Sequence, residues 1–235
     1  MKRLLLCTAA SLALCLGPAA ARADADGAHL EVAAGVTPTF IQDPGYEAFS
    51  SSDLRAERAG ADLRVQVAEF GTVALVPLIS YRGVSEGGDP RGVMKTHLGV
   101  HDVTAGLRLR AWFQPWLGAF VQAEGGLTYA RMRGELTDTS SARGDYSDDA
   151  TTWCAGGLLG VELRLPPSLF ERQKIEWLDF GLEVAGGYLR RGEIDLEPSL
   201  GGGDDNSLPL ADTADFGGLN LSGWTVQVAF TISLF

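Results

Sequence analysis

Apolar and polar residues alternate strictly along the last stretch of the chain, Leu221–Phe235. Trp224 and every second residue after it, as far as Leu234, are apolar, whereas Thr225 and the alternate residues up to Ser233 are small or polar. A period of two over this length predicts a β-strand with one apolar and one polar face.

Seven earlier segments alternate in the same way, so the sequence predicts about eight strands. Pro77 lies inside one of them and predicts a bulge or irregularity, because proline cannot donate a ladder hydrogen bond. Eight is the smallest usual number for an antiparallel up-and-down transmembrane β-barrel, which is the all-β fold we expect. The seven segments span residues 30–40, 59–68, 72–82, 101–113, 117–129, 152–165 and 177–189.

The predicted connections alternate between short and long. Those after the second, fourth and sixth strands are short or moderate, and the others are long and rich in Gly, Asp and Ser. Short turns at the periplasmic end and long loops at the extracellular end are typical of an outer-membrane barrel. The barrel domain therefore covers residues 24–235, and its four extracellular loops are expected at about 41–58, 83–100, 131–150 and 190–220.

The polar parity carries charges of both signs in the middle of the strands, separated by Gly, Ala, Thr and Gln. An eight-stranded barrel is just wide enough inside for side chains, so opposite charges there would pair and fill a narrow lumen. The expected lumen network consists of Asp62, Arg64, Arg108, Arg110, Glu124, Glu162, Arg164, Asp179 and Glu183.

Aromatic residues lie at both ends of the apolar parity, with smaller apolar residues between them. From Leu30 to Phe40 is ten steps, which at ~3.3 Å per residue and ~40° tilt spans roughly 25 Å, the height of a lipid-facing band. We expect these rings to mark the two membrane interfaces. The group near the long loops is Phe40, Tyr81, Tyr129, Trp153, Tyr188 and Trp224, and the group at the opposite end is Phe113 and Phe180.

The final strand, with Phe230, Ile232, Leu234 and Phe235, resembles the last strand of the small outer-membrane barrels, the family of the OmpA transmembrane domain and of the OmpW and opacity-type proteins. The resemblance covers residues 24–235 and is architectural. It implies an outer-membrane protein that contacts the lipid bilayer and lipopolysaccharide and whose last strand is read by the outer-membrane assembly machinery. Leu234, and not Phe235, is in register with the apolar residues here, which departs from the family pattern.

Residues 1–23 have the features of a secretory signal peptide that is cleaved on export. Lys2 and Arg3 precede an apolar stretch, and Ala21-Arg22-Ala23 is a small-x-small cleavage site. Removal of these residues takes the formal charge from −11 to −14, because they contain three basic and no acidic residues. Such acidity argues against a nucleic acid partner.

The sequence offers no convincing catalytic or metal-binding pattern. Its three histidines are His29, His97 and His101, and no ligand set is fixed beside them by spacing. Cys154, the one cysteine beyond the signal, is expected to be a packing residue. We therefore expect no enzyme activity, no cofactor and no metal.

Three functions fit the pattern. The first is a non-enzymatic outer-membrane barrel with a narrow, charge-paired lumen and surface-exposed acidic loops, in a structural or surface-interaction role. The second is a small passive, porin-like channel, which the many glycines on the polar parity would allow. The third is a soluble periplasmic lipocalin-like carrier, which shares the alternation but has the two faces exchanged. The sequence identifies neither a loop partner nor a solute nor the oligomeric state.

Overall fold

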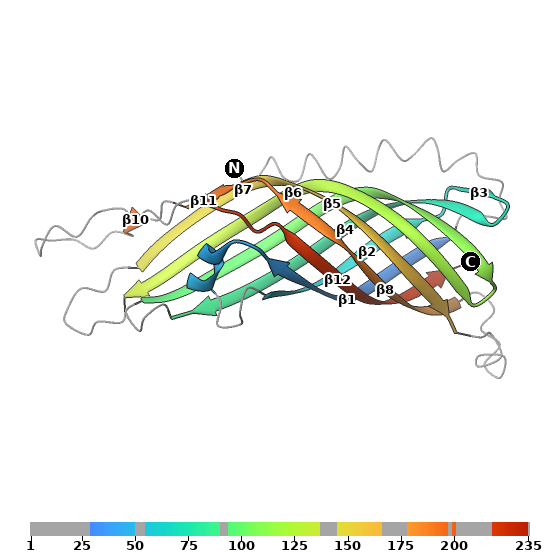
Figure 1. Cartoon of the computed structure of the whole chain (residues 1–235), viewed down its shortest axis with the longest axis horizontal. Coiled ribbons are helices and arrows are strands. Elements are labelled where there is room, and N and C mark those ends of the chain that lie inside the picture. The colour runs from blue at the N-terminus through green and yellow to red at the C-terminus, as the bar shows by residue number, and fades with distance from the viewer. Residues whose placement is uncertain are drawn as a thin grey trace, which may run out of the picture.

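Eight long antiparallel strands follow one another around a closed barrel (Figure 1). The structure is a computed structural model that describes residues 29–49, 55–89, 94–136, 145–165, 178–196, 199–200 and 218–234. The predicted all-β barrel of about eight strands is confirmed. The long strands are β1 (Leu30–Ile41), β2 (Arg55–Val65), β4 (Val73–Gly88), β5 (Met94–Gln114), β6 (Leu117–Leu136), β7 (Asp145–Arg164), β8 (Leu178–Arg191) and β12 (Gly223–Leu234).

The remaining elements are short. A 3-10 helix, η1 (Pro44–Ala48), follows β1, and the three-residue strand β3 (Ala68–Phe70) pairs with the start of β4. Two-residue strands β9 (Ile194–Asp195) and β11 (Gly218–Leu219) pair with each other, and β10 (Ser199–Leu200) pairs with β7. No helix among the described residues is long and apolar enough to cross a membrane.

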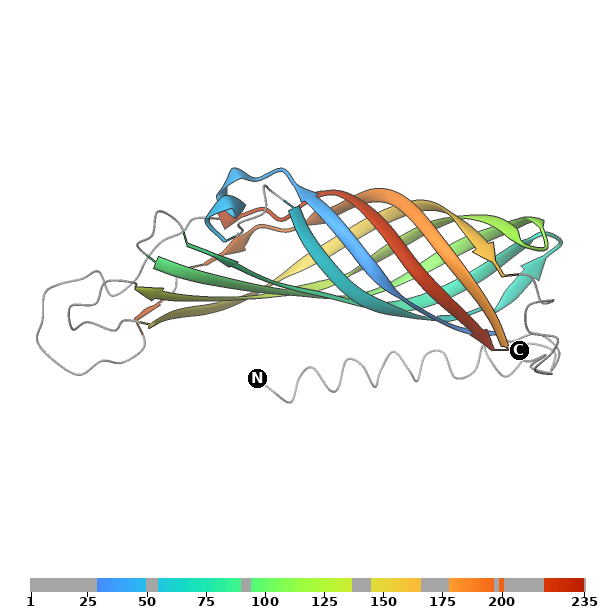
Figure 2. The same ribbon diagram turned by 90° about the horizontal axis from the view of Figure 1, so that it is seen from below.

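The barrel closes because β1 pairs with β12 as well as with β2, and β7 pairs with β8. Starting from Glu31, the register passes through Arg64 and Leu78 and around the remaining strands to Gly223 and then to Ile41. One circuit thus returns to β1 ten residues further along. This stagger requires strands tilted by roughly 40° to the barrel axis, which Figure 2 shows as a continuous diagonal sweep.

The expected irregularity at Pro77 is present. Arg64 lies opposite Leu78, but Ala68 lies opposite Leu75, so three residues of one chain segment face two of the other. Pairing with β5 on the other side of β4 continues without a shift through Pro77. The bulge therefore lies on the one side of β4 where the β2 and β3 ladders break.

The four long loops were predicted too long. Strands β4 and β5 occupy most of residues 83–100, and β6 and β7 occupy much of 131–150. Strand β2 begins inside 41–58, and 190–220 contains the end of β8 together with β9, β10 and β11. Strands β4 to β7 thus extend as a wall well beyond the rest of the barrel, at the left of Figure 1.

The alternation of the strands reverses its faces within this wall, which explains the error. On β6, Leu127 and Tyr129 face outward, but two residues further Arg131 is the exposed residue, while Ala130 and Met132 are buried inside. Polar residues outside and apolar residues inside are what a strand shows when its outward face meets water and its inward face packs in a core. The sequence analysis followed one phase only and ended each strand where the phase changed.

Candidate functional site: the filled barrel interior and its rims

The centre of the barrel is filled by ion pairs around Glu183. Its carboxylate accepts hydrogen bonds from Arg64, with Nη1–Oε1 and Nη2–Oε2 distances of 2.5 and 2.9 Å, and also from Arg108. Arg64 further bonds to Glu31 at 2.6 Å and to Asp62 at 2.7 Å. The Arg64, Arg108 and Glu183 side chains have no exposed surface. Each of these charges therefore depends on its partners for the solvation that water would otherwise supply.

A second group of charges continues toward the end of the barrel opposite the extended strands. Arg110 Nη2 bonds to both carboxylate oxygens of Glu31, at 2.8 and 2.7 Å, and its Nε lies 2.8 Å from Glu162 Oε2. Arg164 lies 3.7 Å from Glu162 and 3.5 Å from Asp179, and these last contacts are partly exposed. The structure thus brings the predicted residues of this end together as one chain of alternating charge.

The remaining predicted residue, Glu124, lies further outward. It accepts a hydrogen bond of 2.6 Å from Arg82 Nη1 and one of 3.0 Å from Gln122, which in turn accepts from Arg108 Nε at 3.0 Å. Arg82 also reaches Asp62 at 3.4 Å. Central and outward charges are therefore linked through neutral as well as ionic groups.

A third group surrounds Asp102 near the outer end of the lumen. Its carboxylate accepts hydrogen bonds from Arg58 at 2.5 Å, from Arg191 at 2.6 and 3.2 Å, and from Thr128 at 2.7 Å. Thr39 accepts from Arg58 as well. Asp102 is thus held between two buried guanidinium groups.

Five members of the interior network were missed by the sequence analysis, although they lie on the polar parity of their strands or at the strand ends. Together with the nine predicted residues they give seven arginines and seven carboxylates, so the paired charges of the lumen balance. Glu31, Arg82 and Asp102 lie on the polar parity inside predicted strands, so this signal was available in the sequence. Arg58 and Arg191 fell within the overestimated loops 41–58 and 190–220. The missed residues are Glu31, Arg58, Arg82, Asp102 and Arg191.

Little space remains between these side chains. Three internal cavities, one near His29 and Arg164, one near Thr37 and Leu158 and one near Gly35, each have room for about one water molecule. The described part of the lumen is therefore packed rather than open.

An apolar cap covers the outer end of the lumen. Its wall consists of the inward residues of the extended strands, among them Leu98 and Met132, which are fully buried. Tyr46 and Phe49 of the η1 region pack onto this wall. The other members are Ile41, Ala56, Val84, Val100, Ala130, Ile194, Leu196, Leu219 and Leu221.

Asp43 joins the two segments that form the lid of this cap. One carboxylate oxygen accepts from Gly45 N at 2.8 Å and caps η1, and the other accepts from Asn220 N at 2.7 Å. The backbone of Gln42 also donates to Ser222 O at 3.4 Å. The connection after β1 and the one before β12 are therefore held together over the barrel mouth.

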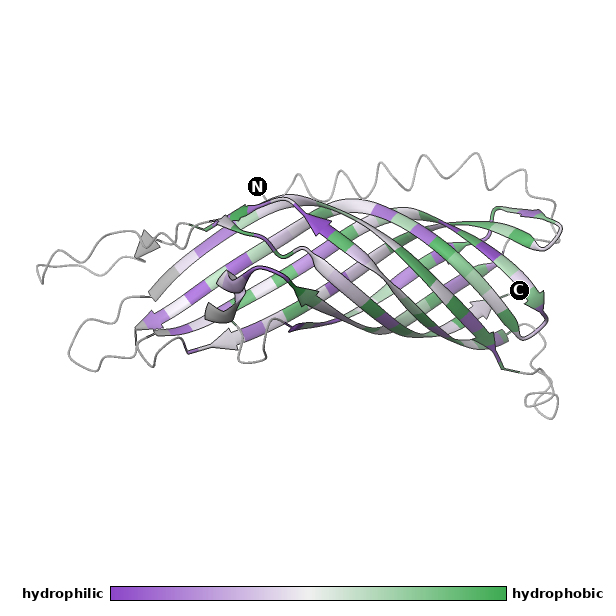
Figure 3. Ribbon diagram, viewed as in Figure 1, coloured by the Kyte–Doolittle hydropathy of each residue, from purple (hydrophilic) through white to green (hydrophobic). Residues whose placement is uncertain are grey.

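The lower barrel, which is the part between the extended strand ends and the opposite end of the barrel, has an apolar outer surface. Apolar residues of intermediate size, such as Val36, Leu107, Leu159 and Val184, are exposed there. Figure 3 shows the apolar residues in green, alternating along the strands with pale and purple ones. A belt of exposed aliphatic side chains around a closed barrel fits the hydrocarbon core of a bilayer.

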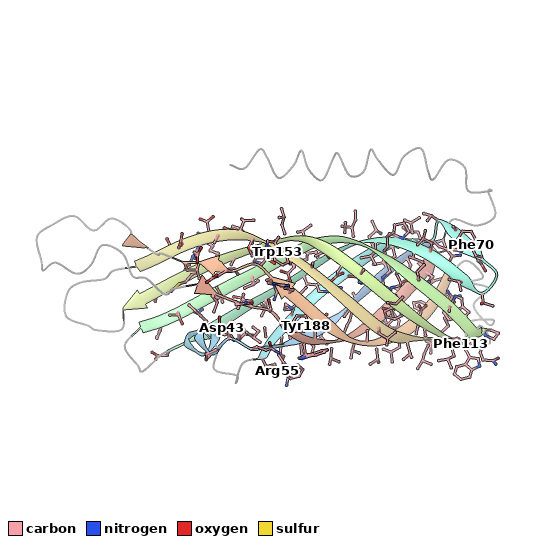
Figure 4. The ribbon with its side chains drawn as sticks, turned by 45° about the horizontal axis from the view of Figure 1, so that its top comes forward. Asp43, Arg55, Phe70, Phe113, Trp153 and Tyr188 are labelled. Carbon is pink, nitrogen blue, oxygen red and sulfur yellow. The ribbon has the colours of Figure 1, made fainter. Side chains whose placement is uncertain are left out.

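The predicted interface aromatics lie at the two edges of this belt (Figure 4). Phe113 is 65% exposed at one edge and Trp224 is 61% exposed at the other. Tyr188 and Phe180 are half-buried because they pack on neighbouring rings, Tyr188 edge-on against Trp224 at 5.4 Å and Phe180 against Phe230 at 5.7 Å. The outward side chains at the outer edge also include Phe40, Tyr81, Tyr129 and Trp153.

The residues expected to guide assembly form the end of β12. Phe230 and Ile232 face outward, and Leu234 is half-buried between Leu30 and Leu178 of the neighbouring strands. Phe235 and the predicted signal peptide, 1–23, lie outside the described residues.

The histidines show no metal centre. His97 is exposed on β5, and His101 stacks between Tyr81 and Tyr129 with its Nδ1 2.8 Å from the Tyr81 hydroxyl. Within the described ranges, no group of three or more His, Cys, Asp or Glu residues could hold a metal ion. Cys154 is buried and not in a disulfide.

Comparison with known proteins gives a likeness in fold only. No protein-family model and no curated protein matches the sequence. Similar solved structures include Neisserial surface protein A (NspA; 11% identity, TM-score 0.42, 90% of this chain and 99% of that one) and the outer membrane protein OprG from Pseudomonas aeruginosa (14%, 0.44, 88% and 96%). The outer membrane protease OmpT from Escherichia coli is also similar (9%, 0.48, 89% and 96%).

Proposed function

We propose that the protein is an integral outer-membrane β-barrel with a sealed lumen, which acts without enzymatic activity as a structural or surface-interacting protein. The observation that carries this proposal is the arrangement of its two faces in the lower barrel. The outward face is an apolar belt edged by aromatic rings, and the inward face is a balanced network of buried ion pairs. Only a lipid environment makes such an outward face favourable.

The same arrangement supports a bilayer location and export. Residues 1–23 then act as the cleaved signal, the acidic loops predicted for the extracellular end face the cell exterior, and the outer leaflet with its lipopolysaccharide surrounds the belt. The assembly machinery would read the end of β12 through Phe230, Ile232, Leu234 and Phe235. The bilayer, the lipopolysaccharide and the assembly machinery follow as partners from the proposed location, and no partner is proposed for the loops.

A soluble lipocalin-like carrier does not fit this geometry. Such a carrier holds its ligand in an apolar interior and presents polar residues to water. Here the lower interior holds seven arginines and seven carboxylates, and the apolar residues of the same strands lie outside.

The passive channel is the second candidate, and glycines such as Gly35, Gly60 and Gly106 on the inward face favour it by keeping the wall thin. Against it stand the paired guanidinium groups across the centre and the apolar cap above them. A solute would have to cross both layers.

Planar-bilayer recording on the purified, refolded protein tests the sealed lumen. We expect no steady conductance steps from the wild-type protein, because displacing Glu183 from Arg64 and Arg108 would leave charges buried without partners. Regular, reproducible steps would establish the channel instead.

A further inference from the structure

A cluster of basic side chains faces outward on the extended β5–β6 hairpin. Lys95, His97, Arg131 and Arg133 are all exposed, and they lie on the same surface because His97 is directly opposite Arg133 and Arg131 is opposite Gly99. Exposed Glu135, opposite Lys95, and exposed Asp149, opposite Arg131, lie on the same face, so the net charge of this surface is only slightly positive. It still differs in sign from the whole chain, whose formal charge is −11.

The height of this cluster is set by the aromatic rim below it. Arg131 and Arg133 follow Tyr129 by two and four residues on β6, and Tyr129 belongs to the rim that edges the apolar belt. At ~3.3 Å per residue and ~40° tilt they lie roughly 5 and 10 Å above that ring. This is the level of lipid headgroups rather than of acyl chains or of bulk water.

The two guanidinium groups are available to a ligand. Over the ranges that the structure describes, neither Arg131 nor Arg133 makes a side-chain hydrogen bond or an ion pair, although Asp149 lies opposite Arg131 on β7. Each of the seven interior arginines, by contrast, is paired with a carboxylate, and exposed Arg55 bonds to Glu57 at 2.5 Å. Planar guanidinium forks match the oxygens of a phosphate group well.

A row of three flat rings lies directly beneath the cations. His101 is stacked between Tyr81 and Tyr129, with centroid distances of 6.0 and 6.5 Å and interplanar angles of 17° and 25°. Such rings present apolar faces with polar edges, which suits the boundary between a sugar headgroup and its acyl chains. Outward Ala105 and Gly125, further down on β5 and β6, leave acyl chains free to lie close to the strands.

We propose that this surface of β5 and β6 binds the phosphate groups of a phosphorylated glycolipid in the outer leaflet. Arg131 and Arg133 are the principal phosphate ligands, Lys95 adds positive charge, the His97 ring offers a further hydrogen bond, and the sugar rests on the row Tyr81–His101–Tyr129. The proposal rests on the proposed outer-membrane location, and it deepens that function by assigning specific residues to the contact with the outer-leaflet lipopolysaccharide. It also gives an acidic protein a positively charged surface at the level of the anionic headgroups.

The test compares binding of two probes to the full chain refolded in detergent micelles. The probes are diphosphorylated lipid A and the same lipid A after removal of its phosphates, and retention of the lipid is measured by native mass spectrometry. We expect the wild-type protein to bind the phosphorylated probe about tenfold or more tightly than the dephosphorylated one. The double variant Arg131→Gln/Arg133→Gln is expected to lose about tenfold in affinity for the phosphorylated probe, whereas Arg131→Lys/Arg133→Lys should keep most of it.

Arg55→Gln is the matched control, because it also removes an exposed arginine near the extracellular end but one that already has a carboxylate partner. Its affinity should stay at the wild-type value. If the double Gln variant binds as tightly as the wild type, or if both probes bind equally, the assignment is wrong. Full competition by millimolar inorganic phosphate alone would show a free-phosphate site and would overturn the glycolipid assignment too.

The outcome can be separated from that of the proposed function. Each variant is first checked for a mobility shift between unheated and boiled samples, which reports a folded barrel, and Arg133→Gln alone replaces the double variant if the latter does not fold. If the wild type is folded and heat-modifiable but binds both lipid A probes equally, only this inference is refuted. A wild type that is not a membrane barrel refutes the proposed function itself.

Discussion

At the scale of single residues, the lumen is held by buried charges that depend on one another, because solvent does not reach them. Arg64 and Arg108 share the carboxylate of Glu183, and none of the three side chains touches solvent. Replacement of such a buried pair by apolar groups can be harmless, but removal of one member leaves the others charged and unpaired. The contribution of the network to the stability of the barrel should therefore show when a single member is replaced.

The first prediction concerns this network of buried ion pairs. Arg108→Ala leaves Glu183 with one guanidinium partner fewer and Gln122 without its donor, so we expect a loss of about 3 kcal/mol or more in the free energy of unfolding. Arg55→Ala, which removes an exposed ion pair, should cost less than about 1 kcal/mol. Urea unfolding of both variants in lipid vesicles measures the difference, and equal effects would refute the plugged lumen.

The lipid-facing residues make a second prediction at this scale. Leu107 is exposed in the middle of the belt, so Leu107→Arg should cost roughly 2–4 kcal/mol of folding free energy in a bilayer. His97→Arg, beyond the aromatic rim on the same strand, should change the stability by less than about 1 kcal/mol. The same urea experiment decides this, and a tolerated Leu107→Arg would mean that this face does not contact lipid.

At the scale of elements, a single strand changes the character of its outward face along its length. β5 and β6 face lipid with apolar residues over their lower part, and above the rim they face water with charged residues and turn Leu98 and Met132 inward. The upper strands thus behave like a water-soluble sheet with its own small core. That core, closed by η1 and by the β9–β11 pair, is what seals the outer mouth.

This reversal of faces is directly testable. Leu98→Asp places an unpartnered carboxylate in the cap, whereas Ser85→Asp places one on the outward face of neighbouring β4. We expect the first to expose the upper ends of β5 and β6 to rapid amide hydrogen exchange and the second to leave exchange unchanged. Equal protection in the two variants would show that the extended strands have no inward core.

The lid depends on Asp43 in the same region. Asp43→Ala removes the acceptors for Gly45 N and Asn220 N, at a cost of about 1–2 kcal/mol of local stability. Hydrogen exchange should then quicken for residues 43–49 and 218–222 and stay slow for β6 residues Leu117–Val121 at the far end. Unchanged exchange at Gly45 would argue that Asp43 does not hold the lid.

At the scale of the whole molecule, the sequence was sufficient to predict a barrel and to predict which face of each strand points inward. Alternation over Trp224–Leu234 and its counterparts placed the strands, and the charges on the opposite parity pointed to the interior. The wall formed by the extended ends of β4 to β7 was not predicted, because its alternation changes phase at Tyr129 and its glycines, such as Gly87 and Gly134, resemble loop residues. The partner of each charge could not be predicted either, since Arg64 and Glu183 meet across the barrel and only the closed register brings them together.

The measurement that tests the central claim most directly is a quenching scan of β12. Single cysteines are placed at each position from Val226 to Phe230 in a Cys154→Ser background, labelled with a fluorophore, and exposed to a lipid-dissolved and to an aqueous quencher. We predict strong quenching from lipid at Val226, Val228 and Phe230 only, because these residues face outward from the belt, while Gln227 and Ala229 face the packed lumen. Lipid quenching at Gln227 and Ala229 instead, or no alternation at all, would contradict a barrel that has its apolar face in the membrane.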